Sequence, residues 1–375
     1  MSTLSADRLH EIRKGLARVG LDGMLVTDPD NRFYVSGHLI DDHGPTESAG
    51  VALVGQYRAL LLTSPNNVDW AASEAPEFEV RGWQRPWEQT VRTAFGELGW
   101  QRIGFERASI SFATWAALVE PEGQYSLVPM DGWLDEIRWV KSCDEIDKLQ
   151  VAIDITDRVF EIVEDQLRPG MSERTVAATI ERGFLEHGAD GAAFPATVGS
   201  GPNGARPHHR SGDRELREGE PIVIDIGAKL AGYCADLTRT VWIGALSDRA
   251  SKIYSVVEDA QAAALKAVAN GVPARVVDQA TKTVFEGAEM SNYAIHAVGH
   301  GLGIRVHDGP SVNSASDRPL QTGNVVTIEP GLYVPGEFGV RIEDVVVVQE
   351  NGYRQLSRAR KRSMRNQVVE GVVAL

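Results

Sequence analysis

Four acidic residues lie within apolar, β-branched stretches in the second half of the chain. Asp225 interrupts IVIDIGA, and Asp236 follows eleven positions later in CADLTRTVWIG. Glu329 and Glu343 lie in VVTIEPGLYV and GVRIEDVVVV. Aspartate is depleted in strands, and an ionised carboxylate is costly to bury without a partner. The pattern predicts a compensating positive charge, and two divalent cations would neutralise four carboxylates.

Each pair of acids is brought together if its stretch folds as a β-hairpin. A turn at Leu230 and Ala231 makes the two aspartates direct cross-strand neighbours on one face. A loop centred on Gly336 does the same for the two glutamates. Like charges directly opposite destabilise a hairpin, so both hairpins need a cation between their acids.

A glycine-spaced run, HAVGHGLGIRVHDGP at 296–310, separates the two hairpins and contains His296, His300 and His307. One imidazole from this run could complete a metal site with a nitrogen ligand. Taken singly, each acid could be a surface or ion-paired residue, and a lone histidine is more often structural. Four acids in two matched hairpins with a histidine between them favour a dinuclear metal site.

Three segments, PHHRSGDRELREGEPIVIDIGAKLAGYCADLTRT, HAVGHGLGIRVHDGP and VVTIEPGLYVPGEFGVRIED, resemble the pita-bread metallopeptidases. They are most similar to the proline-specific branch, which contains prolidase (Xaa-Pro dipeptidase) and aminopeptidase P. NRFYVSG also resembles the N-terminal domain of that family. The resemblance implies an α+β protein in which residues 141–375 form a pita-bread catalytic domain with a pseudo-two-fold repeat. A smaller α/β domain, residues 1–140, precedes it.

The resemblance also implies roles for the acids and histidines. Asp225 would bind one metal, His300 and Glu329 the other, and Asp236 and Glu343 would bridge the two. Mn²⁺ or Co²⁺ is expected, with Zn²⁺ or Fe²⁺ as alternatives. Two bound cations would lower the pKa of a water and polarise the scissile carbonyl, which permits amide hydrolysis.

Further side chains match family positions around the metals. Glu329 would also act as the base that passes a proton to the leaving amine. His208 and His307 would contact substrate and stabilise the tetrahedral intermediate. The remaining matches would order the site beside the ligands: His296, Tyr333 and Arg341.

The sequence departs from the family pattern at two places. HLIDDHGPTESAG at 38–50 follows NRFYVSG where relatives usually have an aromatic residue and a shorter loop, which puts an N-terminal substrate contact in doubt. His307-Asp308-Gly309 stands where His-Glu is common, and this change could tune the surroundings of the metals. Neither departure removes a ligand.

The elements that must position these residues can be read from hydrophobic periodicity. RLHEIRKGLARVGLD predicts an amphipathic helix, and DGMLVTD, AGVALVG and YRALLLT predict strands. A long helix is expected from about Ser142 to Leu167, ended by Pro169-Gly170. PGMSERTVAATIERGF at 169–184 and NGVPARVVDQATKTVF at 270–285 share Gly, Val and Phe at an offset of 101. Each copy reads as helices followed by a hairpin, which predicts a site between two related halves.

Composition excludes some functions. The chain has 375 residues with 38 basic and 52 acidic side chains, giving a formal charge of −14, which disfavours nucleic acid or an anionic membrane as partner. The N-terminus lacks the apolar core of a signal peptide, and no stretch of about 18 apolar residues could span a membrane. A cytoplasmic protein is expected, and a homodimer is implied by the resemblance. The basic stretch RQLSRARKRSMR at 354–365 is interpreted as a solvated surface.

The leading hypothesis is therefore a dinuclear-metal exopeptidase that cleaves short peptides with proline at the second position, either as a dipeptidase or as an aminopeptidase. A methionine-type or broader aminopeptidase would share the five ligands but usually lacks a domain like 1–140. Creatinase shares the two-domain body but lacks the metal ligands. A metal-binding protein of the same fold without catalysis is the alternative from a different class. A phosphate cradle in VGSGPNGARPHH is disfavoured because the loop lacks the Lys-Ser/Thr ending of a P-loop.

Overall fold

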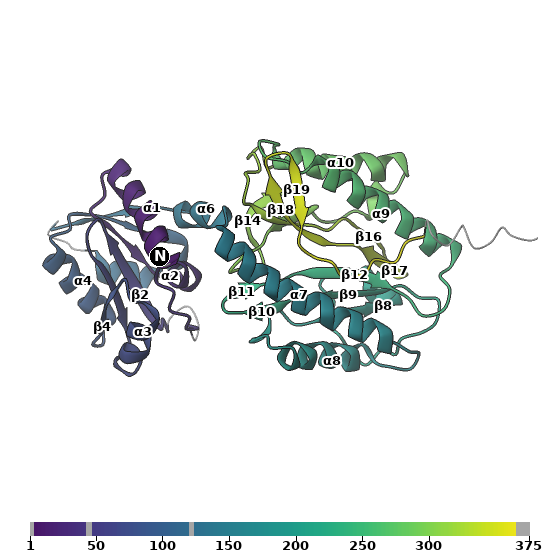
Figure 1. Ribbon diagram of the computed structural model, residues 1–375, viewed down its shortest axis with the longest axis horizontal. Coiled ribbons are helices and arrows are strands. Elements are labelled where there is room, and N and C mark those ends of the chain that lie inside the picture. Colours follow the sequence, from purple (N-terminus) through teal and green to yellow (C-terminus); the bar gives the residue numbers. More distant parts are fainter. Residues whose placement is uncertain (1–3, 43–46, 120–123, 365–375) are drawn as a thin grey trace, which may run out of the picture. The chain divides into compact units, whose positions relative to one another are not determined.

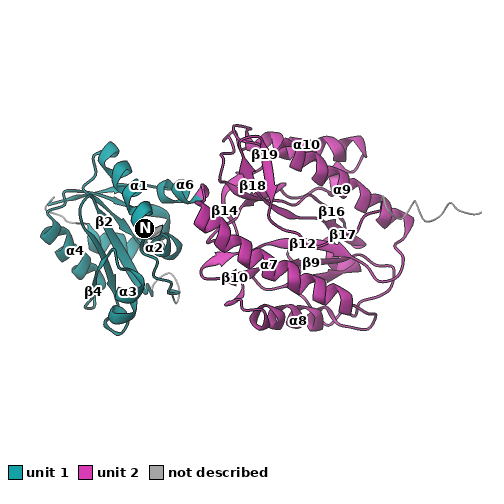
Figure 2. Ribbon diagram, viewed as in Figure 1, with its two compact units in different colours: residues 1–138 teal, residues 139–375 magenta. Residues whose placement is uncertain are grey.

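The computed structural model describes residues 4–42, 47–119 and 124–364, and the chain divides into two compact units, 1–138 and 139–375 (Figure 2). The division falls two residues before the boundary expected from the sequence. Part of the unusual segment 38–50, namely 43–46, lies outside the described residues. Its effect on substrate contacts stays a prediction.

The first unit is built on a six-stranded mixed sheet with the order β4-β3-β2-β1-β5-β6. β1 pairs antiparallel with β2 and parallel with β5. The strands are β1 Gly23–Val26, β2 Gly50–Gly55, β3 Ala59–Thr63, β4 Glu79–Gly82, β5 Arg102–Phe105 and β6 Ser126–Pro129. The helices up to the division are α1 Leu4–Val19, α2 Pro29–Ser36, α3 Val68–Glu74, α4 Trp87–Leu98, α5 Phe112–Leu118 and α6 Trp133–Trp139.

The sequence pattern of the first unit is confirmed at its start. The predicted amphipathic helix is α1, which buries Leu9, Ile12 and Leu16 at the three- and four-residue spacing of one helix face. The three predicted strands are β1, β2 and β3, and every residue of each is buried. This unit is α/β, because helices pack against a sheet whose central strands are buried.

The long helix at the start of the second unit is α7, Cys143–Gln166. Its first turn is fixed by a capping box: the Ser142 hydroxyl accepts from Glu145 N–H, and the Glu145 carboxylate accepts from Ser142 N–H. Leu167 caps the other end. The predicted span from Ser142 to Leu167 is confirmed.

The second unit repeats one arrangement twice. Helices α8 Glu173–Glu186 and α10 Ala274–Gly287 begin at 173 and 274 and end at 186 and 287, an offset of 101 at both ends. The partner of α7 is α9 Asp248–Ala267. Figure 1 shows α7 and α8 on one side of the strands of this unit and α9 and α10 on the other. The expected pseudo-two-fold repeat is therefore present.

The strands follow the same repeat. The order β8-β9-β12 in the first half matches β13-β15-β18 in the second. The first half contains β7 Gly191–Ala192, β8 Thr197–Ser200, β9 Ile222–Ile226, β10 Ala228–Leu230, β11 Tyr233–Cys234 and β12 Leu237–Val241. The second contains β13 Gly299–Gly301, β14 Asp308–Val312, β15 Val325–Ile328, β16 Gly331–Val334, β17 Phe338–Arg341, β18 Asp344–Gln349 and β19 Gly352–Gln355. A 3₁₀ helix, Gly201–Ala205, follows β8.

Apolar packing holds each half-repeat onto its helices. In the first half, Phe160 of α7 and Ile180 and Phe184 of α8 are fully buried against Ile224 of β9. Each such side chain contributes about 1.5–3 kcal/mol when removed from water. Because the strands are fixed by this core, the acids at their ends have little freedom of position.

The register of the first hairpin differs from the prediction. Leu230 pairs with Tyr233, so the turn lies at Ala231 and Gly232, one residue later than expected. Asp225 therefore faces Thr238, and Asp236 is its diagonal neighbour rather than its direct partner. The positive φ of Ala231 and Gly232 (48° and 82°) explains the shift, because glycine tolerates this conformation at no steric cost. A displacement of two residues keeps both carboxylates on one face.

The second hairpin has the predicted register. β16 and β17 pair Val334 with Phe338 around the turn at Gly336. Further from the turn, β15 and β18 pair Ile328 with Asp344 in the same register. Glu329 and Glu343 stand opposite each other at the gap between these two ladders.

The basic stretch near the C-terminus is not a solvated surface. Arg360 and Arg362 both pair with Glu164 of α7, at 2.6 and 2.9 Å, and Lys361 pairs with the buried Asp344. Its last residue, Arg365, lies outside the described residues. No helix among the described residues is long and apolar enough to cross a membrane.

Candidate metal centre

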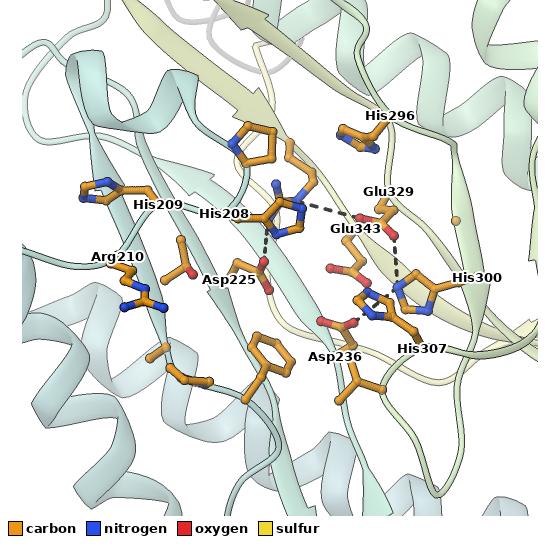
Figure 3. A pocket seen from close by; sticks show the side chains of 18 of the residues that line it. His208, His209, Arg210, Asp225, Asp236, His296, His300, His307, Glu329 and Glu343 are labelled. Carbon is orange, nitrogen blue, oxygen red and sulfur yellow. Dashed lines mark hydrogen bonds and ion pairs between the residues drawn. The ribbon is translucent and has the colours of Figure 1, made fainter. Parts of the chain in front are cut away.

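The four acids converge where the two half-repeats meet. Asp225 projects from β9, Asp236 precedes β12, Glu329 follows β15, and Glu343 precedes β18. Figure 3 shows their carboxylates turned toward one another inside a single pocket. Symmetry of the fold thus places two acids from each half around one point.

Oxygen atoms of Asp225, Asp236 and Glu343 all lie within 4.8 Å of one another. His300, from β13, extends the group: its Nε2 is 3.2 Å from Glu329 Oε1 and 3.6 Å from Asp236 Oδ2. The five residues expected as metal ligands are therefore gathered in one place.

The charge of this group is poorly compensated by the protein itself. Burial and the neighbouring acids raise the pKa of Glu343 to about 8 and that of Asp236 well above its usual range. Glu343 Oε1 is buried and has no hydrogen-bond partner among the described residues. Clustered carboxylate oxygens, one of them unpartnered, and a single imidazole form a donor set that fits divalent cations.

Glu329 and His300 have the opposite balance. Burial alone would raise the pKa of Glu329, but the hydrogen bond and charge of His300 lower it to about 2. Burial alone would lower the pKa of His300, but the same contact raises it to about 9. Glu329 is thus the acid of the group that stays ionised most readily.

Arg341 organises one side of the site. Its guanidinium donates to Asp225 Oδ2 at 2.5 Å, to Tyr333 Oη at 2.7 Å and to Thr238 Oγ1 at 2.9 Å. Tyr333 Oη also lies 2.9 Å from His296 Nε2. Burial lowers the pKa of His296 and raises that of Tyr333 to about 12, so a neutral His296 can accept from the phenol. The three residues expected to order the site are connected in this way.

His208 and His307 border the same pocket. The His307 ring stands edge-on to His300, with centroids 4.3 Å apart, and burial lowers its pKa. In Figure 3, His208 lies beside Asp225, and His307 lies beside His300 and Asp236. The two exposed imidazoles therefore flank the acids from opposite sides.

The pocket has a volume of about 1450 Å³ and a mixed lining. Apolar side chains, among them Phe194 and Val306, alternate with polar ones. Three arginines also line it: Arg341, which is engaged with Asp225, and Arg174 and Arg210. Arg174 pairs with Asp213 at 2.9 Å, whereas no ion pair joins Arg210 to another described residue.

Some residues that support the site gave no signal in the sequence. Thr238 emerged only when the register placed it opposite Asp225. Lys141 lies 3.7 Å from Asp308, both being buried, so the unusual aspartate after His307 faces a cation from the start of the second unit. The link between Glu173 and His209, at 2.8 Å, spans 36 positions and matches no local pattern.

Comparisons with known proteins show the family of the chain. Residues 147–350 match the model of metallopeptidase family M24, and residues 8–140 match the creatinase/prolidase N-terminal domain. The uncharacterized peptidase YqhT of Bacillus subtilis is 34% identical over 94% of this chain and 98% of its own. The structure of an Xaa-Pro dipeptidase from Bacillus anthracis superimposes with a TM-score of 0.89 at 30% identity, covering 96% and 99% of the two chains. An X-Pro aminopeptidase from Thermotoga maritima gives 0.87 at 31%, covering 95% and 98%.

Proposed function

Because the chain belongs to metallopeptidase family M24, and is a peptidase of its proline-specific branch, we propose that it is a dinuclear-metal exopeptidase acting on short Xaa-Pro peptides. The observation that carries this proposal is the cluster of Asp225, Asp236 and Glu343 oxygens within 4.8 Å, together with Glu343 Oε1, which has no hydrogen-bond partner in the described part of the chain. Such a cluster has a clear purpose only with cations bound.

In this proposal Asp225, Asp236, His300, Glu329 and Glu343 would hold the two cations, with Asp236 and Glu343 shared between them. Bound cations would supply Lewis acidity, lowering the pKa of a water and polarising the carbonyl to be cleaved. Mn²⁺ or Co²⁺ is the proposed metal, with Zn²⁺ or Fe²⁺ as alternatives, because carboxylates with one imidazole can bind all four ions.

Glu329 is the proposed base. In the metal-free site the contact with His300 holds the pKa of Glu329 near 2, and a bound cation would likewise favour its ionised form. Its carboxylate can accept a proton from the attacking water and deliver it to the departing nitrogen.

His208 and His307 are the proposed donors to the oxygen that gains charge in the tetrahedral intermediate. Burial favours the neutral form of His307, which keeps one ring N–H to donate. Both histidines line the pocket that contains the acids (Figure 3). Arg341, Tyr333 and His296 hold Asp225 on one side of this space.

Arg210 bears on the choice between dipeptidase and aminopeptidase. It is a cation in the pocket lining that no other described residue pairs with, whereas Arg341 is engaged with Asp225. An exopeptidase must leave the N-terminal amine near the acids, so an arginine elsewhere in the pocket suits the carboxylate of a dipeptide. Arg210 therefore favours a dipeptidase.

The experiment compares metal-stripped protein reloaded with Mn²⁺ on an Xaa-Pro dipeptide, its C-terminal amide, an Xaa-Pro-Xaa tripeptide and an Xaa-Ala dipeptide. We expect cleavage of proline substrates, with the dipeptide preferred. Arg210→Ala should lower kcat/KM for the dipeptide by about 10-fold or more and leave the amide unchanged, since a charge-assisted hydrogen bond is worth about 1.5–3 kcal/mol. Arg249→Ala, an exposed arginine outside the pocket lining, is the control.

The outcomes separate the alternatives. Equal cleavage of the dipeptide and the tripeptide would favour an aminopeptidase, and cleavage of Xaa-Ala or Met-Xaa peptides at the same rate would favour a broader or methionine-type enzyme. Binding of about two metal ions with no hydrolysis of any peptide would favour a non-catalytic metal-binding protein. A homodimer, a cytoplasmic location and the assignment of residues 1–140 and 141–375 as domains stay predictions from the sequence.

A further inference from the structure

The two half-repeats differ at the first residue of their second helix. Glu173 begins α8, and the residue 101 positions later, Ala274, begins α10. Both are fully buried, and both helices start from equivalent bridges, Ser172 with Glu215 and Pro273 with Pro319. The fold therefore forms at this position without a carboxylate. Because burying a carboxylate is costly, Glu173 is expected to bind a part of the chain that only the first half contains.

Glu173 gathers hydrogen bonds from a single segment, residues 200–212. Oε1 accepts from the Ser200 N–H and hydroxyl, each at 2.8 Å. Oε2 accepts from His209 Nε2 at 2.8 Å and Gly212 N–H at 3.3 Å, and the Asn203 amide lies 3.1 Å from both oxygens. The donors enclose the carboxylate on all sides. Although burial opposes ionisation, these bonds lower the pKa of Glu173, so it remains an anion.

The segment that Glu173 holds has little structure of its own. After the 3₁₀ helix Gly201–Ala205 it contains no further helix or strand before Glu220. Ser211 gives a second attachment, accepting from Val198 N–H and donating to Ala196 O. His208 lies between the attached residues Ser200 and Ser211, and its own backbone belongs to no helix or strand.

The close view shows how the attachment orients the segment. In Figure 3 the His209 ring is directed away from the acids, while the adjacent His208 lies beside Asp225. His209 is mostly buried, with 11% of its side chain exposed, and its partner Glu173 is fully buried. The buried His209 ring thus anchors the segment to Glu173, and the neighbouring His208 ring lies in the pocket.

We propose that Glu173 is a positioning residue: through His209 and the backbone of 200–212 it holds His208 at the distance from the acids that the reaction requires. This inference rests on the proposed function, because the role of His208 is part of it. A misplacement of about 1 Å can cost about 100-fold in rate, so loss of Glu173 should lower kcat by about 10- to 100-fold. KM should change little, because His208 acts on the intermediate.

The test is a double-mutant cycle between Glu173→Ala and His208→Ala on an Xaa-Pro dipeptide with saturating Mn²⁺. Glu173→Ala should lower kcat alone and cause no further loss when His208 is already alanine. Glu173→Gln, which keeps one acceptor oxygen, should restore part of the rate. Glu186→Ala, an exposed acid on the same helix paired with Arg182, should behave as wild type. Equal losses from Glu173→Ala in both backgrounds, or no loss in either, would overturn the proposal.

A second variant guards against a folding defect. His209→Ala removes the same link but leaves the Ser200, Asn203 and Gly212 bonds to Glu173 in place, and it should also lower kcat only while His208 is present. Hydrogen exchange of a peptide spanning 200–212 should rise in Glu173→Ala and not in Glu186→Ala. If wild type hydrolyses none of the peptides, the proposed function fails, and this exchange measurement still decides: unchanged exchange would refute the positioning role.

Discussion

Replacing Glu343 by glutamine should stabilise the metal-free protein while abolishing its metal-dependent activity. Glu343 is 1% exposed, its Oε1 has no hydrogen-bond partner among the described residues, and Asp236 lies beside it. Without cations, burial and the charge of the neighbouring acids both disfavour the ionised form of Glu343. Glutamine removes the charge at nearly constant volume, and its amide can donate to Asp236.

The size of the effect follows from the pKa. Raising the pKa of Glu343 from its ordinary 4.5 to about 8 is a shift of 8 − 4.5 = 3.5, which corresponds to about 5 kcal/mol between the two protonation states. Because the folded pKa is raised, the contribution of Glu343 to the stability of the metal-free protein is fully present below pH 4.5 and is lost as the pH rises through 8. At pH 7 the ionisable side chain costs about 3 kcal/mol relative to one with an ordinary pKa.

Unfolding of chelator-treated protein at pH 5.5, 7 and 9 measures this directly, with hydrogen exchange of β18 peptides as the local readout. The variant should exceed wild type by an amount that grows with pH. Added Mn²⁺ should then stabilise wild type strongly and the variant weakly. Glu337→Gln is the matched control, an exposed acid of the same hairpin paired with Arg249, for which about 0–1 kcal/mol and no pH trend are expected. A Glu343→Gln protein that is less stable than wild type by the same amount at all three pH values would refute the reasoning.

Two further predictions concern other parts of the molecule. Burial raises the pKa of Glu106 from its ordinary 4.5 to about 7. Its contribution to the stability of the first unit is therefore present below pH 4.5 and is lost as the pH rises through 7, by up to about 3 kcal/mol. In Glu106→Gln, hydrogen exchange of the 27–31 peptide should rise less between pH 5 and 8 than in wild type. An equal rise in both proteins would contradict this. Gly227→Ala should separate the strands that carry the two aspartates and weaken metal binding in calorimetry, because the added Cβ would meet Ala235 O at 2.0 Å. Gly287→Ala, where nothing lies within 4 Å of the added Cβ, is the control and should leave metal affinity unchanged.

The convergence of the four acids could be predicted from the sequence because their positions follow strand periodicity. The second hairpin has the predicted register on both sides of Glu329 and Glu343, since the loop at Gly336 has a clear centre. The first hairpin was placed wrongly, because the turn could lie on either side of Ala231 and composition alone does not choose. The site survived this error since a shift of two residues returns a side chain to the same face.

What the sequence could not supply are contacts whose partners are distant and whose types are common. Arg360 and Arg362 read as a solvated basic run, yet Glu164 of α7, nearly 200 positions earlier, accepts both. Nothing local distinguishes an arginine that meets water from one that meets a buried acid. The role of Glu173 was hidden in the same way. In the sequence PGMSERTV it indicates only the start of a helix, and its partners in 200–212 are known only from the fold.

The comparison of the halves explains how a nearly symmetric scaffold gives an asymmetric site. The repeat delivers two acids from each half, and this shared part needs only strand geometry. The differences lie in what each half adds: the second half contributes the imidazole of His300 from β13, whereas the first contributes His208 from an irregular segment. His300 is held between the paired Gly299 and Gly301 and by its N–H bond to Thr327 Oγ1, whereas a residue of an irregular segment needs an anchor from elsewhere. Glu173 provides this anchor in the first half, whereas α10 of the second half has Ala274 at the equivalent position.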